Sequence, residues 1–266
     1  MVNTELLLRE LDSRGILRLT LNDGRRRNPL SEAMLTALRS AFDQAGKNPD
    51  VRVIILAANG PAFSAGHDLK EMTAGRDHED RGRAYFSKVM EMCSGVMQAI
   101  VNCPKPVIAE VDGIATAAGC QLVASCDLAV ASENAQFSTP GVHIGLFCST
   151  PMVALSRNVA NKNAMEMLLT GDMISAQRAS EIGLINRVAV ANDLKQTTEE
   201  IAAKIASKSS MTLAVGKKAF YAQREMSLAD AYDYASDVMV QNMLARDAEE
   251  GIGAFIEKRK PVWQDK

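Results

Sequence analysis

The first half of the chain alternates between short, continuously apolar runs and longer amphipathic stretches. The runs are rich in β-branched residues and have few polar interruptions, which is typical of strands covered on both faces. The order of strand, turn and helix recurs and predicts an α/β fold. The expected strands are residues 6–10, 16–21, 51–58, 107–111 and 128–132, and the expected helices begin near residues 28, 83 and 117.

Helical spacing dominates after residue 150, where one short strand is expected near residues 184–188. This last third carries more apolar positions than its own helices can cover, which favours packing against other subunits. We therefore expect a core at residues 1–195 that carries the site, followed by a helical assembly region at residues 196–266.

Composition narrows the classes of protein. With 266 residues, 47% of them hydrophobic, the chain can bury one large core. Thirty basic residues nearly balance thirty-two acidic ones, and the isoelectric point is about 6.0. This balance gives no electrostatic reason to expect nucleic acid or a membrane as partner.

The cysteines indicate a reducing compartment. They lie among apolar residues and include no Cys-x-x-Cys pair: Cys93, Cys103, Cys120, Cys126 and Cys148. Free thiols of this kind favour the cytoplasm, or the mitochondrial matrix if a targeting segment is missing from this sequence. No apolar run is long enough to span a bilayer. No group of side chains has metal-ligand spacing, so no metal is expected.

Two stretches carry the candidate chemistry. Residues 60–72 and 105–122 each predict a buried strand, a turn that contains glycine, and the start of a helix. The first N–H groups of a helix have no partner within the helix and attract anionic oxygens. Two such turns that face one cavity would form an oxyanion hole. No G-x-S-x-G is present, which argues against an α/β-hydrolase.

These two turns resemble those of the enoyl-CoA hydratase/isomerase (crotonase) superfamily, at residues 65–69 (AGHDL) and 117–121 (AAGCQ). Further matches follow in family order over nearly the whole chain. They lie at residues 27–30 (RNPL), 126–127 (CD), 136–140 (QFSTP), 169–176 (LTGDMISA), 181–184 (EIGL) and 250–260 (EGIGAFIEKRK). Residues 115–127, 139–142, 145–151 and 258–263 look closest to the subgroup called enoyl-CoA hydratase domain-containing protein 3.

The resemblance implies a crotonase-like spiral of ββα turns, followed by a helical region that assembles trimers or hexamers. It implies an acyl-CoA thioester as ligand, with coenzyme A as part of the substrate and no separate cofactor. By motif position, the backbone N–H groups of His67 and Ala118 would form the oxyanion hole. Contacts with the coenzyme A moiety are implied for Arg27, Leu30, Ala65, Asp68, Leu69, Lys70, Gly119 and Lys258. Phe255 is implied either to pack on the adenine side of a neighbouring subunit's site or to pack between subunits.

The sequence departs from the family where hydratases carry two glutamates. The first position is Gln121 and the second is Gly141. Adding water to a conjugated thioester needs a base for the water and an acid for the α-carbon. Gln121 can orient a water but cannot accept its proton. Hydratase (lyase) activity is therefore expected to be weak or absent.

Three explanations stay open. The protein binds acyl-CoA without turnover, it uses another group for the proton, or it runs a different reaction on the same enolate, such as isomerisation, hydrolysis or decarboxylation. A vacant space at Gly141 would also permit a bound bicarbonate. Candidate replacement groups are the His67 imidazole, Asp68 and His143, although Asp68 is also placed to cap a helix. We expect His143 and Cys148 to belong to the core.

Overall fold

The computed structural model describes residues 5–266. Residues 1–4, on which the expectation about a targeting segment partly depends, lie outside the described residues. The main sheet of the protein has the strand order β1-β2-β3-β5-β7-β10. The strands are β1 (Leu7–Leu11), β2 (Ile16–Leu21), β3 (Val53–Ala58), β5 (Val107–Val111), β7 (Leu128–Ser132) and β10 (Arg187–Ala189). β1 and β2 pair antiparallel, and every other pair in this sheet is parallel.

A second, smaller sheet repeats the order of the first. It has the order β4-β6-β8-β9. Its strands are β4 (Ala62–Ser64), β6 (Ile114–Thr116), β8 (Gln136–Ser138) and β9 (Ile174–Ser175). The strands β3, β5 and β7 are each followed by a short strand of the second sheet and then by helical turns. The expected spiral of ββα units is therefore confirmed.

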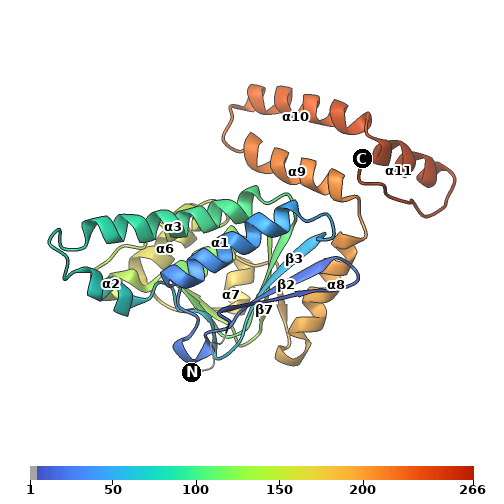
Figure 1. Cartoon of the computed structure of the whole chain (residues 1–266). Coiled ribbons are helices and arrows are strands. Elements are labelled where there is room, and N and C mark those ends of the chain that lie inside the picture. The colour runs from blue at the N-terminus through green and yellow to red at the C-terminus, as the bar shows by residue number, and fades with distance from the viewer. Residues whose placement is uncertain (1–4) are drawn as a thin grey trace.

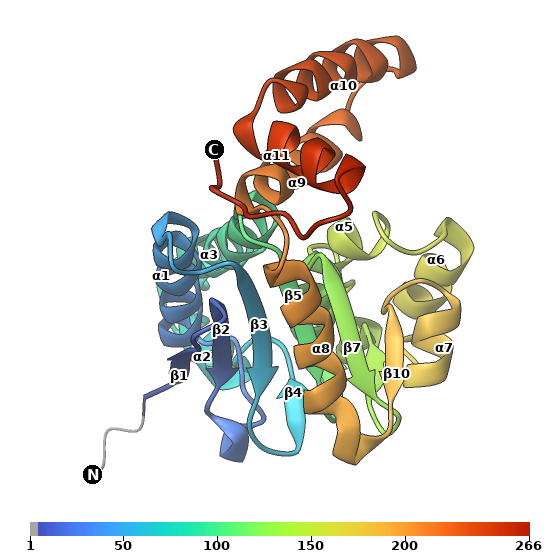
Figure 2. The same cartoon turned by 90° about the vertical axis from the view of Figure 1, so that its right-hand side faces the viewer.

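Helices cover both faces of the main sheet (Figures 1 and 2). α1 (Glu32–Lys47) and α3 (Arg83–Asn102) pack together in the larger core cluster. α1 begins at Glu32, later than expected, because the side chain of Ser31 accepts a hydrogen bond from the Met34 N–H and caps the helix.

α8 (Leu194–Ala206) covers the opposite face of the sheet. Its buried residues Leu194 and Ala202 share a cluster with Val53 and Ile108 of the central strands. A division after residue 195 stays a prediction as a domain boundary, but the packing places α8 with the sheet. The strand expected at 184–188 is observed as β10, which begins later, at Arg187. It begins later because residues 182–186 form the turn after α7.

Five short helices complete the body, and three more helices form an arm. The body helices are α2 (Leu69–Gly75), α4 (Ala118–Ser125), α5 (Pro151–Leu155), α6 (Asn161–Thr170) and α7 (Ala176–Glu181). The arm consists of α9 (Ser210–Gln223), α10 (Leu228–Met243) and α11 (Arg246–Ile256), and it projects from the body (Figure 1).

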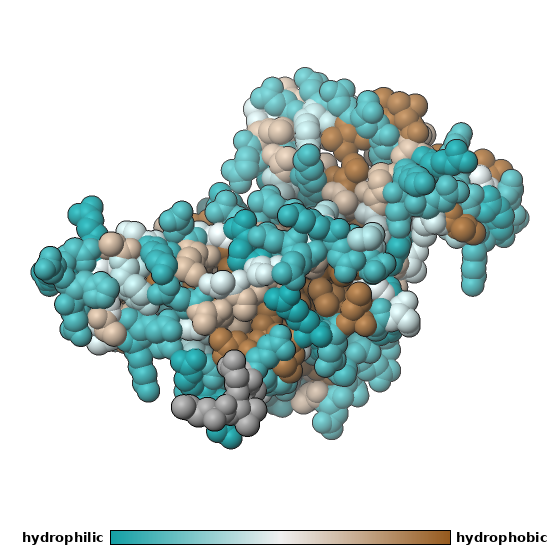
Figure 3. All heavy atoms as spheres, viewed as in Figure 1, coloured by the Kyte–Doolittle hydropathy of each residue, from teal (hydrophilic) through white to brown (hydrophobic). Residues whose placement is uncertain are grey.

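The arm exposes large apolar side chains. Leu244 is 78% exposed and Phe255 is 85% exposed, and neither α9 nor α10 has a buried residue. Brown, hydrophobic atoms are visible among the polar ones on the arm in the space-filling view (Figure 3). Such a surface is what an assembly interface offers.

Candidate functional site

The first glycine turn joins β4 to α2. Gly66 has φ 88°, a conformation that favours glycine, and it turns the chain between Ser64 and the helix. Asp68 caps α2, since its carboxylate accepts hydrogen bonds from the N–H of Lys70 at 2.9 Å and of Glu71 at 3.3 Å. The helix-capping alternative for Asp68 is confirmed.

The turn is held by the segment that precedes α1. The Leu30 N–H donates to the Gly66 carbonyl at 2.8 Å, and the Ala65 N–H donates to the Arg27 carbonyl at 3.0 Å. The buried Asn28 donates from Nδ2 to the carbonyls of Asn59 and Ala62. The sequence reading missed this role of Asn28, although its position before a proline in a turn was a signal for it.

The second turn joins β6 to α4 through a strained residue. Ala117 has φ 50° and ψ −119°, which is unusual for a residue with a Cβ. Its N–H donates to the Ser138 carbonyl at 3.0 Å, which fixes the turn to β8. Strain of this kind costs on the order of 1–3 kcal/mol and often occurs at functional sites.

The two turns touch. A Cβ placed on Gly66 would lie 3.3 Å from the Ala118 nitrogen and 3.0 Å from the Ala117 Cβ. A Cβ on Gly119 would overlap the Ser64 carbonyl. Within residues 5–266, neither the His67 N–H nor the Ala118 N–H donates to a protein acceptor. Two free N–H groups on adjoining turns can serve one oxygen.

The imidazole of His67 is a separate feature. Both ring nitrogens are buried, and within the described chain neither has a hydrogen-bond partner. Burial lowers the pKa of His67, and the nearby backbone of Leu30 offsets part of that effect. The imidazole is therefore neutral near pH 7.

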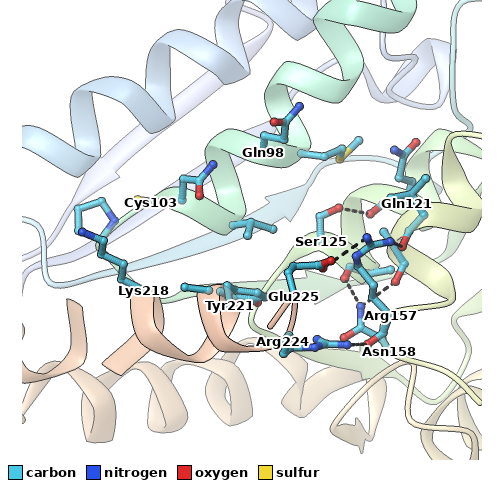
Figure 4. A pocket seen from close by; sticks show the side chains of 18 of the residues that line it. Gln98, Cys103, Gln121, Ser125, Arg157, Asn158, Lys218, Tyr221, Arg224 and Glu225 are labelled. Carbon is cyan, nitrogen blue, oxygen red and sulfur yellow. Dashed lines mark hydrogen bonds and ion pairs between the residues drawn. The ribbon is translucent and has the colours of Figure 1, made fainter. Parts of the chain in front are cut away.

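A cavity of about 980 Å³ opens beside α4, between α3, α5 and α9 (Figure 4). Its walls are mostly apolar, with Met97, Val101 and Ala124 among the lining residues. Arg157 and Lys218 stand at its rim, where both are exposed. The volume suits a ligand of substantial size.

Gln121 faces this cavity from α4 and is only 4% exposed. Its Oε1 lies 3.9 Å from the Cys93 sulfur, which donates to it. Among the α4 residues that line the cavity, Gln121 is the nearest to Ala118 in sequence.

A Cβ on Gly141 would have no free space. A Cβ on it would come 2.8 Å from the Leu146 carbonyl oxygen and 2.9 Å from the Cys148 sulfur. A side chain at position 141 would therefore require Leu146 and Cys148 to shift. The bicarbonate, which would lie farther from the backbone, stays a prediction.

The two residues expected to belong to the core, Cys148 and His143, lie in different surroundings. Cys148 is buried, as expected. His143 is exposed, so its predicted core location is wrong, and its Nε2 hydrogen-bonds the Thr170 carbonyl at 2.8 Å.

The structure separates the residues expected to contact coenzyme A. Arg27, Leu69 and Lys70 are exposed near the first turn. Phe255 and Lys258 lie instead at the end of the arm, far from α2 (Figure 1).

The last turn of α3 and α9 meet at a polar cluster that the sequence reading missed. Lys217 donates from Nζ to the Asp127 carboxylate at 2.6 Å, and to the carbonyls of Ile100 and Lys105. The Tyr221 hydroxyl donates to the other oxygen of Asp127 at 3.0 Å. This cluster fastens α9 to the body.

The fold and the paired turns define a crotonase-type protein. The chain belongs to the enoyl-CoA hydratase/isomerase family, whose profile matches residues 12–266. It is 52% identical over 249 residues to "Enoyl-CoA hydratase domain-containing protein 3, mitochondrial" of Rattus norvegicus, an alignment that covers 94% of this chain and 81% of the rat protein. The predicted family and subgroup resemblance are confirmed.

Solved structures agree with this assignment. The human enoyl Coenzyme A hydratase domain-containing protein 3 superposes with a TM-score of 0.92 at 49% identity, over 97% of this chain and 100% of that one. An enoyl-CoA hydratase of Mycobacterium smegmatis superposes with a TM-score of 0.94 at 50% identity, over 98% and 99% of the two chains. Among residues 5–266, no helix is both long and apolar enough to cross a membrane.

Proposed function

We propose that this chain binds acyl-CoA thioesters and that the thioester oxygen accepts hydrogen bonds from the N–H groups of His67 and Ala118. The observation that carries this proposal is the contact between the turns at Gly66 and Ala118. A donor of this type stabilises a developing enolate by about 3 kcal/mol.

Turnover by hydration is proposed to be weak or absent. The first carboxylate position holds Gln121, and the second holds Gly141 with no room for a side chain. Each general acid or base typically contributes about 10²–10⁴-fold. Binding without turnover, or enolate chemistry that needs no added water, fits this site better than hydration does.

Calorimetric titration with butyryl-CoA and crotonyl-CoA tests the binding proposal. Gly66→Ala should abolish or strongly weaken binding, because the new Cβ meets the second turn. Gly183→Ala is the matched control, since Gly183 also has a positive φ (84°) but lies after α7. Equal binding by both variants, or no binding by the unaltered protein, would overturn the proposal in favour of a structural or protein-interaction role.

A paired assay separates the reactions. We expect α-proton exchange of butyryl-CoA in D₂O to exceed hydration of crotonyl-CoA. Brisk hydration would show that another group supplies the proton, and His67→Gln is then the first variant to compare.

We also propose that the arm assembles trimers or hexamers, because its apolar side chains are exposed in the single chain. Light scattering that shows a monomer at micromolar concentration would contradict this. All five cysteines are free and buried, which supports a reducing compartment, the cytoplasm or the mitochondrial matrix.

A further inference from the structure

The two ends of the Gln121 amide have different surroundings. Oε1 faces the Cys93 sulfur at 3.9 Å. Nε2 donates to no acceptor among residues 5–266, yet it is not sealed inside the protein, because Gln121 lines the cavity. An amide nitrogen that faces a largely apolar cavity without a protein partner calls for an acceptor from a ligand or a water.

Cys93 determines which end of the amide faces the cavity. This residue is fully buried on α3, and burial raises the pKa of its thiol to about 12. The thiol is therefore protonated and donates an S–H hydrogen bond. If the amide were flipped, its NH₂ group would face a sulfur that is only a weak acceptor, so the orientation with Oε1 towards Cys93 is favoured.

Helix geometry places this donor near the start of the acyl chain. Gln121 follows Ala118 by one turn of α4, about 4.5 Å along the axis. A thioester oxygen bound at the Ala118 N–H puts the first carbons of the acyl chain beside Gln121. The cavity then continues past Ala124 and Ser125, the next residues on that face of α4 (Figure 4).

We infer that the site selects 3-oxoacyl thioesters, whose C3 carbonyl accepts a hydrogen bond from Gln121 Nε2. This inference rests on the proposed acyl-CoA function. A ketone oxygen only accepts, which matches a group that presents only donors to the cavity. A saturated chain would leave the amide nitrogen unpaired in a largely apolar environment, which weakens its binding.

The test compares three ligands of equal length by calorimetry: acetoacetyl-CoA, 3-hydroxybutyryl-CoA and butyryl-CoA. The unaltered protein should bind acetoacetyl-CoA about three- to tenfold more tightly than butyryl-CoA, the range for one neutral hydrogen bond. Gln121→Met should remove this preference, because it deletes the donor at similar size. Gln121→Glu should also remove it, yet should still bind 3-hydroxybutyryl-CoA, whose hydroxyl can donate to the new carboxylate.

Two further variants act as controls. Gln196→Met replaces a glutamine outside the cavity, which is exposed on α8 and donates to Glu200, and should leave the preference unchanged. Cys93→Ala should reduce the preference without abolishing binding of butyryl-CoA, since Cys93 acts only by positioning the amide. An unchanged preference in Cys93→Ala would refute that positioning role.

The two proposals fail in different ways. Absence of binding by all three thioesters refutes the proposed function, and with it the ground for this inference. Equal binding of acetoacetyl-CoA and butyryl-CoA, or a preference that survives Gln121→Met, refutes the inference while the acyl-CoA function stands.

Discussion

The sulfur of Cys148 occupies the space into which a side chain at Gly141 would extend. The Cys148 sulfur lies 2.9 Å from the point where a Cβ of residue 141 would be, and the Leu146 carbonyl oxygen lies 2.8 Å from that point. The thiol is buried, and burial raises the pKa of Cys148. A side chain at position 141 therefore requires the loop that carries Leu146 and Cys148 to move.

Gly141→Ala is expected to destabilise the fold by about 1–3 kcal/mol, the usual cost of overpacking. Urea denaturation measures this, with Gly145→Ala as the comparison, because a Cβ on Gly145 meets no atom within 4 Å and costs only its φ of 76°. Gly141→Glu combined with Gln121→Glu should therefore not restore hydratase activity. Rapid hydration of crotonyl-CoA by the double variant would show that the loop moves to make room for a side chain at position 141.

Ala117→Gly should leave stability unchanged or raise it by up to about 2.6 kcal/mol. Relief of the strained φ of 50° is worth about 1–3 kcal/mol, and the greater freedom of glycine in the unfolded chain offsets about 0.4–1 kcal/mol of it. Thermal unfolding measures the difference. Ala115→Gly, two residues earlier in β6, should instead lose stability. Equal losses in both variants would mean that Ala117 carries no strain.

Lys217→Met should loosen α9. The Lys217 side chain is 8% exposed. Breaking such a buried pair leaves Asp127 without its cation, at a cost of about 3–5 kcal/mol. Tyr221→Phe removes a hydrogen bond to the Asp127 carboxylate and should cost about 1.5–3 kcal/mol. Hydrogen exchange of residues 210–223 reports the change directly. Slow exchange in Lys217→Met would show that apolar packing holds the helix.

Stability should fall as the pH drops below about 6.5, the ordinary pKa of histidine in the unfolded chain. Burial lowers the pKa of His67 in the folded state, so the unfolded state binds more protons in this window. Its contribution is present at neutral pH and is lost as the pH falls towards the folded pKa. His67→Gln should flatten the slope of unfolding free energy against pH between about pH 5 and 7. An unchanged slope would assign the dependence to other groups.

Patterns of side-chain type predicted the frame of the fold well. The run Val107–Val111 is buried along its whole length, as its lack of polar alternation indicated. The placement of Asp68 as the cap of α2 also followed from local sequence, because capping depends on the next three residues only.

The occupied space at Gly141 could not be predicted in the same way. It depends on a carbonyl and a thiol contributed by residues five and seven positions later, and on how the loop between them folds. The strain at Ala117 was equally hidden, since alanine gives no sign of a positive φ. The ion pair between Asp127 and Lys217 joins segments that are far apart in the sequence, and local sequence patterns do not predict which distant segments come together.

The helix α9 lines the cavity and is also the first helix of the arm. One rigid element therefore belongs both to the candidate ligand site and to the exposed apolar surface. If a ligand in the cavity and a partner that covers the arm favour the same position of α9, each strengthens the binding of the other by the same factor.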